Sequence, residues 1–156
     1  MNRLACFVLL LLVLLGSGTL TPTAAGQPTT RHQLALNQAL ISSVEGGDVA
    51  QVRRLLAPGA DANAVDDQGM APLIVAAVMN NTAAMTLLLA HHPNVSLRDQ
   101  TGDTALMFAA TERNQEGTRL LLMNHADPNI ADNQGGLALS GALSNMAVLQ
   151  LLLEYG

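Results

Sequence analysis

An internal repeat with a period of roughly 33 residues constrains this chain of 156 residues more than any other feature of its sequence. Asp66, Asp99 and Asp132 each lie one period after the one before. The same spacing separates the members of three further sets of identical residues: Gly69, Gly102 and Gly135; Leu73, Leu106 and Leu139; and Ala76, Ala109 and Ala142. Self-similarity at this period predicts a solenoid, in which each unit buries its apolar face only against its neighbours.

Each unit carries the signals of a turn followed by two helices. The turns are DDQG, DQTG and DNQG, where Gly permits positive φ and Asp accepts hydrogen bonds from its own turn. A short helix follows, as APLIVAAV or TALMFAAT, and its small Ala side chains allow a neighbouring helix to approach closely. After a polar interruption, a second helix ends in the triplets 87–89 and 120–122, which are all Leu.

These segments resemble the ankyrin-repeat family, whose pattern is D-x-x-G-x-T-P-L-H-x-A-A followed by x-x-L-L-x-x-G-A-D-x-N. The second unit reads DDQGMAPLIVAA and LLLAHHPNVS, and the third reads DQTGDTALMFAA and LLLMNHADPNI. The first retains VRRLLAPGADANAVD, and the fourth, DNQGGLALSGALSNMAVLQLLLEYG, has its Leu triplet two residues early. The resemblance covers residues 31–156 and implies an all-α ankyrin-repeat solenoid of about four helix-turn-helix units joined by β-turn or hairpin loops. Their expected bounds are 31–65, 66–98, 99–131 and 132–156, the last being short or truncated.

The N-terminal residues 1–25 have the pattern of a secretory signal peptide. Arg3 precedes an unbroken apolar run from Leu4 to Leu15, which as a helix would reach ~18 Å, short of the ~30 Å hydrocarbon core. Small residues follow, and we expect cleavage after Ala25 or Gly26, with 26–30 as a linker. An uncleaved membrane anchor is the alternative. The compact signal and a basic complement made only of Arg favour a bacterial protein that is periplasmic or secreted.

The family's Thr-Pro-Leu-His corner is never complete in this chain. Its His is missing in every unit, and Thr104 is the only hydroxyl left to cap a first helix. We therefore expect stability to rest on aliphatic stacking between units. Four methionines are expected to act as adaptable filler in that stack: Met79, Met85, Met107 and Met123.

The two ends of the array are expected to differ. A first helix starting near Thr29 or Thr30 can serve as a polar cap, with Gln33 and Asn37 facing water and Leu40 facing inward. The last helix, MAVLQLLLEYG, is nearly all apolar. Either the last unit is truncated, or the apolar edge is covered by another protomer through self-association.

The sequence offers no catalytic, cofactor or nucleic-acid site. It has no Ser elbow, phosphate-binding Gly-rich loop with Lys, or HExxH, and the net charge of −5 disfavours a phosphate-binding face. His92 and His125 are one period apart, too distant to share a zinc ion at ~2.1 Å per bond. We interpret them as polar helix stops and expect no metal. With His91 they leave open a weak, adventitious metal site.

The predicted function is therefore non-catalytic binding of another protein outside the cytoplasm, with no nucleic-acid partner and no membrane contact once the signal is removed. One version inhibits or stabilises an exported enzyme; the alternative is a structural or self-associating scaffold. In the ankyrin family the turn tips and first helices form the concave partner-binding surface. Carried onto this chain, these positions are Val65, Asp67, Gln68, Met70, Val78, Met79, Arg98, Gln100, Thr101, Asp103, Thr111, Glu112, Asn133 and Gln134.

Overall fold

The computed structural model describes residues 27–156, and the compact unit considered below comprises His32–Gly156. The predicted signal peptide, 1–25, and its cleavage site lie outside the described residues. Within 27–156 the chain forms eight helices and no strand, apart from an isolated antiparallel bridge between Arg98 and Thr104. The prediction of an all-helical repeat array is confirmed.

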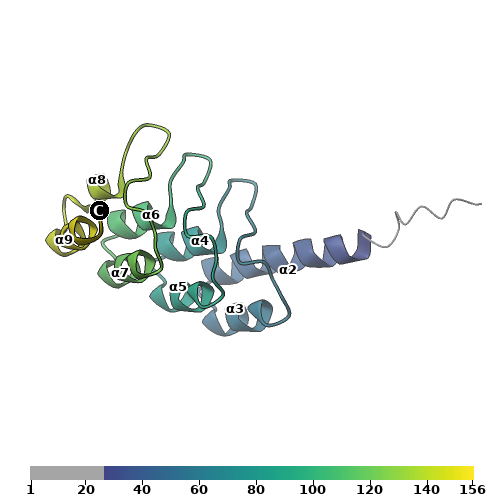
Figure 1. The fold of residues 1–156 in the computed structure, drawn as a ribbon. Helices are drawn as coiled ribbons and strands as arrows, with labels where there is room; N and C mark the ends of the chain where they lie inside the picture. The colour runs from purple at the N-terminus through teal and green to yellow at the C-terminus, as the bar shows by residue number, and fades with distance from the viewer. Residues whose placement is uncertain (1–26) are drawn as a thin grey trace, which may run out of the picture. The chain divides into compact units, whose positions relative to one another are not determined.

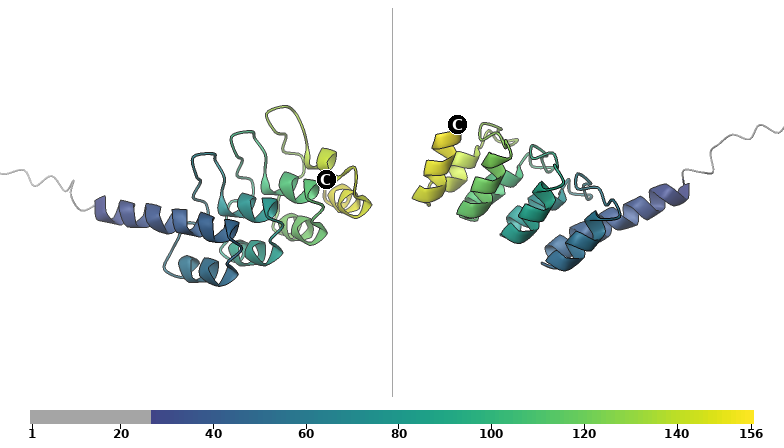
Figure 2. Two further views of the ribbon diagram at one scale, coloured as in Figure 1. Left: turned by 180° about the vertical axis from the view of Figure 1, so that it is seen from behind. Right: turned by 60° about the horizontal axis from the view of Figure 1, so that its bottom comes forward.

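The helices form pairs that stack in chain order. In Figure 1 the first helices α4, α6 and α8 form one row, the second helices form another, and the turns protrude beyond the first row. Figure 2 shows each pair displaced from the one before. The helices are α2 (Gln27–Glu45), α3 (Val49–Leu56), α4 (Pro72–Val78), α5 (Thr82–Leu89), α6 (Ala105–Thr111), α7 (Gln115–Met123), α8 (Ala138–Ala142) and α9 (Met146–Tyr155).

The core is built from aliphatic and small side chains at equivalent positions of successive units. Ala76 and Ala109 are fully buried in the first helices, and Leu88 and Leu121 in the second. Because Ala presents only a methyl group, neighbouring first helices approach closely and need no aromatic side chains between them.

The expectation for the methionines is half correct. Met85 and Met107 are buried and fill the stack as predicted, but Met79 and Met123 are exposed. Met79 is the C-cap of α4 and Met123 is the last residue of α7. Each lies where its helix ends, so the neighbouring unit does not cover its side chain.

Polar caps start the second helices. The side chains of Asp48, Asn81, Asn114 and Asn145 each accept a hydrogen bond from the backbone of the first turn. Among the first helices α4, α6 and α8, only α6 has such a cap: the Thr104 hydroxyl accepts from Met107 N, which confirms its predicted role. The helix α4 starts instead with Pro72, whose missing N–H needs no partner.

Four described residues other than Gly adopt positive φ, and each lies just beyond the end of a helix. His92 and His125 have φ of 51° and 66° and lie within three residues of the ends of α5 and α7, which confirms the interpretation as helix stops. Asn80 and Arg113, with φ of 52° and 59°, play the same part after the first helices. In the second and third units a left-handed residue therefore follows each of the two helices at a periodic position.

The helix α2 is the polar start of the array. It begins at Gln27, within the range 26–30 that we expected to be a linker. Leu40 is buried as expected. Gln33 and Asn37, however, do not simply face water. Gln33 Nε2 donates to Gly59 O at 2.9 Å, and Asn37 Oδ1 accepts from Asp61 N at 2.9 Å, so the cap is tied to the loop that follows α3.

The fourth unit is shortened within its first helix. Its N-cap Leu137 stands at the same position of the repeat as Thr104, but α8 has five residues where α6 has seven. The following N-cap, Asn145, consequently comes two positions earlier in its unit than Asn114 does. The Leu triplet comes two residues early because α8 is two residues shorter than α6. The second helix of the unit, α9, has its full length.

Candidate protein-interaction surface

Each of the three turns is closed by the Asp that begins it. Asp66 Oδ1 accepts from Gln68 N at 2.8 Å and from Met70 N at 2.9 Å. Asp99 and Asp132 make the equivalent pairs of hydrogen bonds at 2.7–2.9 Å. A carboxylate oxygen that accepts hydrogen bonds from two backbone N–H groups fixes the conformation of the turn. The repeated Asp is therefore a structural residue, as its periodicity predicted. We call the turns 66–69, 99–102 and 132–135 the turn row.

Hydrogen bonds join each turn to the next along the turn row. Gln100 Nε2 donates to Asp67 O at 2.6 Å, and Asn133 Nδ2 donates to Gln100 O at 2.9 Å. These three residues occupy the same position of the repeat in successive units. In the first turn this position is Asp67, whose carboxylate can only accept hydrogen bonds. The two later turns carry amides, whose N–H groups reach the preceding backbone.

The backbone and Arg98 reinforce the same connections. Gln100 N donates to Gln68 O at 3.1 Å, and Asn133 N donates to Thr101 O at 3.0 Å. The Arg98 guanidinium donates to Gly102 O at 2.9 Å within its own turn and to Ala131 O at 2.8 Å in the next. The turn row is consequently a connected strip rather than three independent loops.

The turn glycines record how closely the turns pack. All three adopt positive φ, 78° at Gly69, 88° at Gly102 and 85° at Gly135. A Cβ at Gly102 would lie 2.5 Å from Arg98 Nη2 and 2.8 Å from Asn133 N, whereas one at Gly135 would meet nothing within 4 Å. Gly102 is enclosed because a further turn packs against it.

The fourteen residues predicted to contact a partner fall into three groups, none of them fully buried. The first group makes side-chain hydrogen bonds within a turn or between turns: Arg98, Gln100, Thr101, Asp103 and Asn133. The second is half-buried or bonded to its own helix: Met70, Val78 and Thr111. The third group is exposed and makes no side-chain hydrogen bond within the described chain: Val65, Asp67, Gln68, Met79, Glu112 and Gln134. We call this third group the presented residues; that they bind a partner stays a prediction.

The presented residues come from two places in the repeat. Val65, Asp67, Gln68 and Gln134 lie in or beside the turns. Met79 and Glu112 are the C-caps of α4 and α6, at equivalent positions of their units. Met79 is 51% exposed, while Met70 is half-buried against the core. Of the two methionines among the fourteen predicted residues, only Met79 is freely available to a partner.

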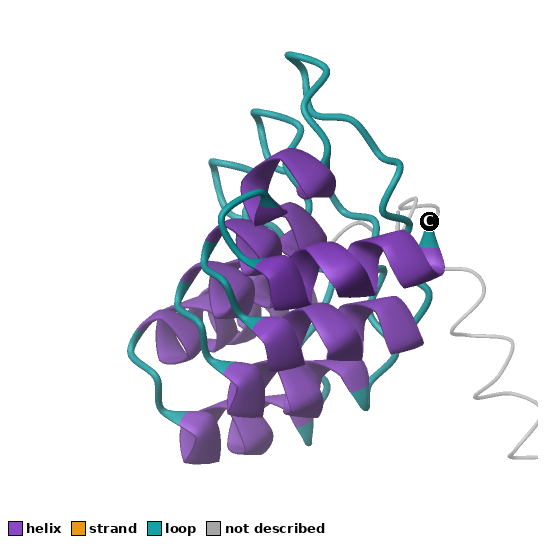
Figure 3. Ribbon diagram, turned by 90° about the vertical axis from the view of Figure 1, so that its left-hand side faces the viewer, coloured by secondary structure: helices purple, strands orange, loops and turns teal. Residues whose placement is uncertain are grey.

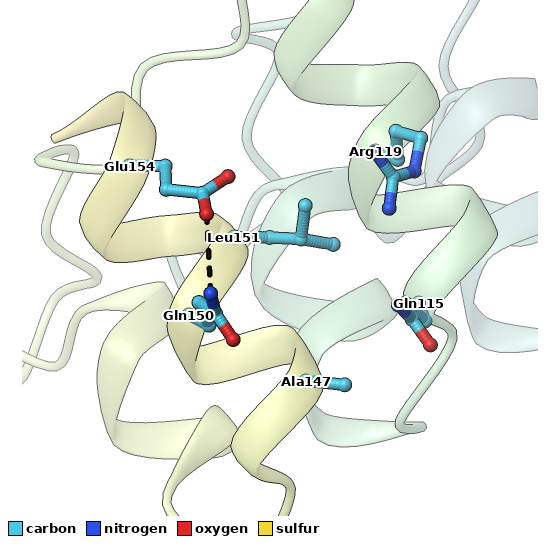
Figure 4. Close-up of a pocket in the computed structure, with 6 residues that line it drawn as sticks. All are labelled: Gln115, Arg119, Ala147, Gln150, Leu151 and Glu154. Atoms are coloured by element: carbon cyan, nitrogen blue, oxygen red, sulfur yellow. Dashed lines mark hydrogen bonds between the residues drawn. The ribbon is translucent and has the colours of Figure 1, made fainter.

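Sequence reasoning missed the role of the amides at Gln100 and Asn133. The sequence did carry a signal for this role. The position is an amide in the second and third turns, each of which follows another turn, but an Asp in the first. Sequence reasoning also missed a shallow groove of about 280 Å³ between α7 and α9, shown in Figure 4. This groove is lined by Gln115, Arg119, Ala147, Gln150, Leu151 and Glu154, and Gln150 Nε2 donates to Glu154 Oε1 at 3.3 Å.

The remaining predicted chemistry is reported for the described residues only. Among them, no three His, Cys, Asp or Glu side chains are arranged to hold a metal ion. His91, His92 and His125 are all exposed at the ends of second helices. No helix within residues 27–156 has the length and apolar character needed to cross a membrane.

The fold is a repeat solenoid whose turns and first helices form an extended surface. Comparison with family models gives a match to ankyrin repeats in three copies, over residues 36–132. The chain belongs to the ankyrin-repeat family, and ankyrin repeats are protein–protein interaction modules. A search of curated proteins found no match to this chain.

Proposed function

We propose that this protein is exported and binds another protein through the presented residues of its turn row and first helices. The observation that carries the proposal is the connected turn row. Hydrogen bonds between turns fix the backbone, so Asp67, Gln68 and Gln134 are held in place before a partner arrives. A backbone that is already fixed loses little conformational entropy on binding, and this favours affinity.

The charge of the surface indicates the kind of partner. Asp67 and Glu112 are exposed carboxylates, and the net charge of the chain is −5. Arg98, the cation beside the turns, directs its guanidinium to backbone carbonyls of the turn row. Such a surface attracts a basic protein and tolerates an uncharged one. Met79 adds an adaptable apolar contact at its edge.

The proposal is tested by matched charge reversals on an affinity-tagged chain. We expect the wild-type chain to recover a specific protein from the extracytoplasmic extract of its own source. Asp67→Arg and Glu112→Arg should each weaken binding to the purified partner at least 10-fold by calorimetry. Glu116→Arg is the control, because it makes the same change four residues beyond Glu112, on α7. No specific partner, or equal binding by Asp67→Arg and wild type, would contradict the proposal.

Export is tested separately. The 1–25 segment is proposed to act as a signal, so the chain recovered from outside the cytoplasm should begin at Gly26 or Gln27 by intact-mass measurement. A chain found only in the cytoplasm, with residue 1 retained, would overturn this part of the proposal and leave the binding surface untouched.

The most specific version makes the partner an exported enzyme that the array inhibits or stabilises. If so, adding the purified chain should change the partner's activity or raise its Tm by a concentration-dependent amount. Asp67→Arg should abolish the effect and Glu116→Arg should retain it. A partner whose activity and Tm are unchanged at saturating chain would exclude this version.

A further inference from the structure

The methionines on the helices of the second and third units fall into two classes. Met85 is fully buried and Met107 is 6% exposed, whereas Met79 is 51% exposed and Met123 is 61% exposed. Both exposed residues belong to units that have a following unit in place, so their exposure does not depend on where the array ends. Solvent access to the methionine side chains therefore differs sharply within one small domain.

The position of each methionine in the repeat explains the two classes. Met79, the C-cap of α4, corresponds to Glu112, the C-cap of α6, and both are exposed. Met85 corresponds to Thr118, and both are fully buried. Figure 3 looks along the array from the end of α8 and α9, and it shows the short connections between the two helices of each pair following one another along one edge of the stack. Met79 begins one of these connections, so its side chain lies beside the packed helices and not between them.

An exposed thioether is the most readily oxidised group that the described part of the chain offers, because residues 27–156 contain no Cys and no Trp. A lone pair on the sulfur attacks one oxygen of hydrogen peroxide, and the O–O bond breaks. The other oxygen takes up the proton and leaves as water, so the sulfur loses two electrons and the peroxide gains them. The product is a polar sulfoxide, which disrupts apolar contacts that the thioether makes.

We propose that Met79 is an oxidation-sensitive site, at which a peroxide forms the sulfoxide and thereby weakens binding of the partner. This regulation rests on the proposed function, because Met79 is the only methionine among the presented residues. The thioether is the apolar contact at the edge of that surface. A partner side chain that covers it would have to bury the sulfoxide oxygen without a hydrogen-bond donor, and this costs binding free energy.

The fold tolerates this reaction at Met79 and not at Met85. The backbone N–H of Met79 donates to Val75 O at 2.9 Å, and this bond, which closes α4, does not involve the sulfur. Met85 Sδ instead lies in the core, where Asn114 Nδ2 donates to it at 3.9 Å. A close-packed interior has no room for an added oxygen. Oxidation of Met85 would therefore disturb the stack, whereas oxidation of Met79 changes only the surface.

The first measurement maps the reaction on the full chain, in the form in which the host cell produces it. The chain is treated with hydrogen peroxide, and the sulfoxide at each methionine is followed by peptide mass spectrometry. Met79 and Met123 should react about 10-fold faster than Met85 and Met107. The far-UV spectrum should stay unchanged while only the exposed residues are converted. Reaction of Met79 at the rate of Met85, or loss of helix when Met79 is converted, would overturn the proposal.

The second measurement compares the affinity of each chain for the purified partner before and after peroxide treatment. The double variant Met123→Leu/Met146→Leu keeps Met79 as the most exposed of the described methionines that remain, and oxidation should weaken its binding about 5-fold. Met79→Leu is the matched control. Its own starting affinity is the reference, and oxidation should change that affinity by less than about 2-fold. A methionine sulfoxide reductase with a dithiol, which releases the oxygen as water and leaves a disulfide, should restore binding by the oxidised double variant.

The outcomes separate this regulation from the proposed function. Equal loss of binding in oxidised Met79→Leu would assign the effect to another residue and overturn the proposal. A double variant that binds equally well before and after oxidation of Met79 would overturn the regulation alone. A chain that binds no partner even before oxidation would overturn the proposed function, and the regulation with it.

Discussion

The third and fourth units begin with nearly the same turn and end in different environments. Asp99 and Asp132 close their turns with equivalent hydrogen bonds. Yet Gly102 is enclosed by the next turn and Gly135 is open, and Leu122 is buried where Leu153 is exposed. Local sequence thus determines the shape of each unit, while burial is determined by the unit that follows. Pairs of identical changes in the two units separate these contributions.

Truncation of the equivalent leucines should give the largest difference. Leu122→Ala removes a buried side chain and should lower the free energy of unfolding by about 2–5 kcal/mol. Leu153→Ala should change it by no more than about 0.5 kcal/mol, as for other exposed sites. Urea denaturation of the two variants measures both. Equal losses at the two sites would mean that the fourth unit is covered in the monomer.

The turn glycines give the next comparison. Gly102→Ala and Gly135→Ala share the strain of an L-residue at positive φ, about 1–2 kcal/mol. Gly102→Ala also forces Arg98 and the Asn133 backbone to move, so we expect it to cost about 1–3 kcal/mol more. Thermal unfolding of the two variants compares them directly. If Gly135→Ala is the more destabilised, the turn row is not held together in the way described.

Capping of the first helices should have a smaller effect. Thr104→Ala removes the only side-chain cap of these helices and should cost about 1 kcal/mol. Leu137→Thr supplies the missing cap of α8 at the equivalent position and should stabilise the fourth unit by up to about 1 kcal/mol. Amide hydrogen exchange in α6 and α8 locates each change. A Thr104→Ala variant as stable as wild type would show that the Met107 N–H finds another acceptor.

The helix stop after α7 should give the smallest effect, and one of opposite sign. His125 adopts φ of 66°, and the residue that corresponds to it in the fourth unit, Gly156, is already a glycine. Relief of left-handed strain exceeds the entropy cost of an added glycine, so His125→Gly should stabilise the protein by about 0.5 kcal/mol. Chemical denaturation resolves this change when several titrations are averaged. Destabilisation would instead assign the imidazole a packing role.

The periodic part of the structure was accessible from the sequence, and the contacts between units were not. The repeat spacing predicted the turn Asp residues, the turn glycines and the helix pairs, because these depend on residues close together in the chain. The cap at Thr104 and the stops at His92 and His125 followed for the same reason.

What could not be predicted depends on how neighbouring units are placed in three dimensions. The side chains of Arg98, Gln100 and Asn133 bond to the neighbouring turn, which the sequence did not predict; that they also contact a partner stays a prediction. Met79 and Met123 were expected inside the stack, but the ends of their helices extend beyond it. The early Leu triplet signalled a deletion, and only the structure places it within α8.

The side-chain hydrogen bonds along the turn row connect residues one repeat period apart, and this range has a consequence for the order in which the protein comes apart. Contacts limited to adjacent units allow unfolding to begin at one end and proceed unit by unit. Among the described units, the first and the fourth each have a neighbour on one side only. The fourth also has the short helix α8, which lacks a side-chain cap, so within residues 32–156 it should open first. Its opening would uncover Leu122, the equivalent of Leu153, in the unit before. Each step of such opening therefore exposes the equivalent apolar face of the next unit inward, so partial unfolding moves this face along the array and does not remove it.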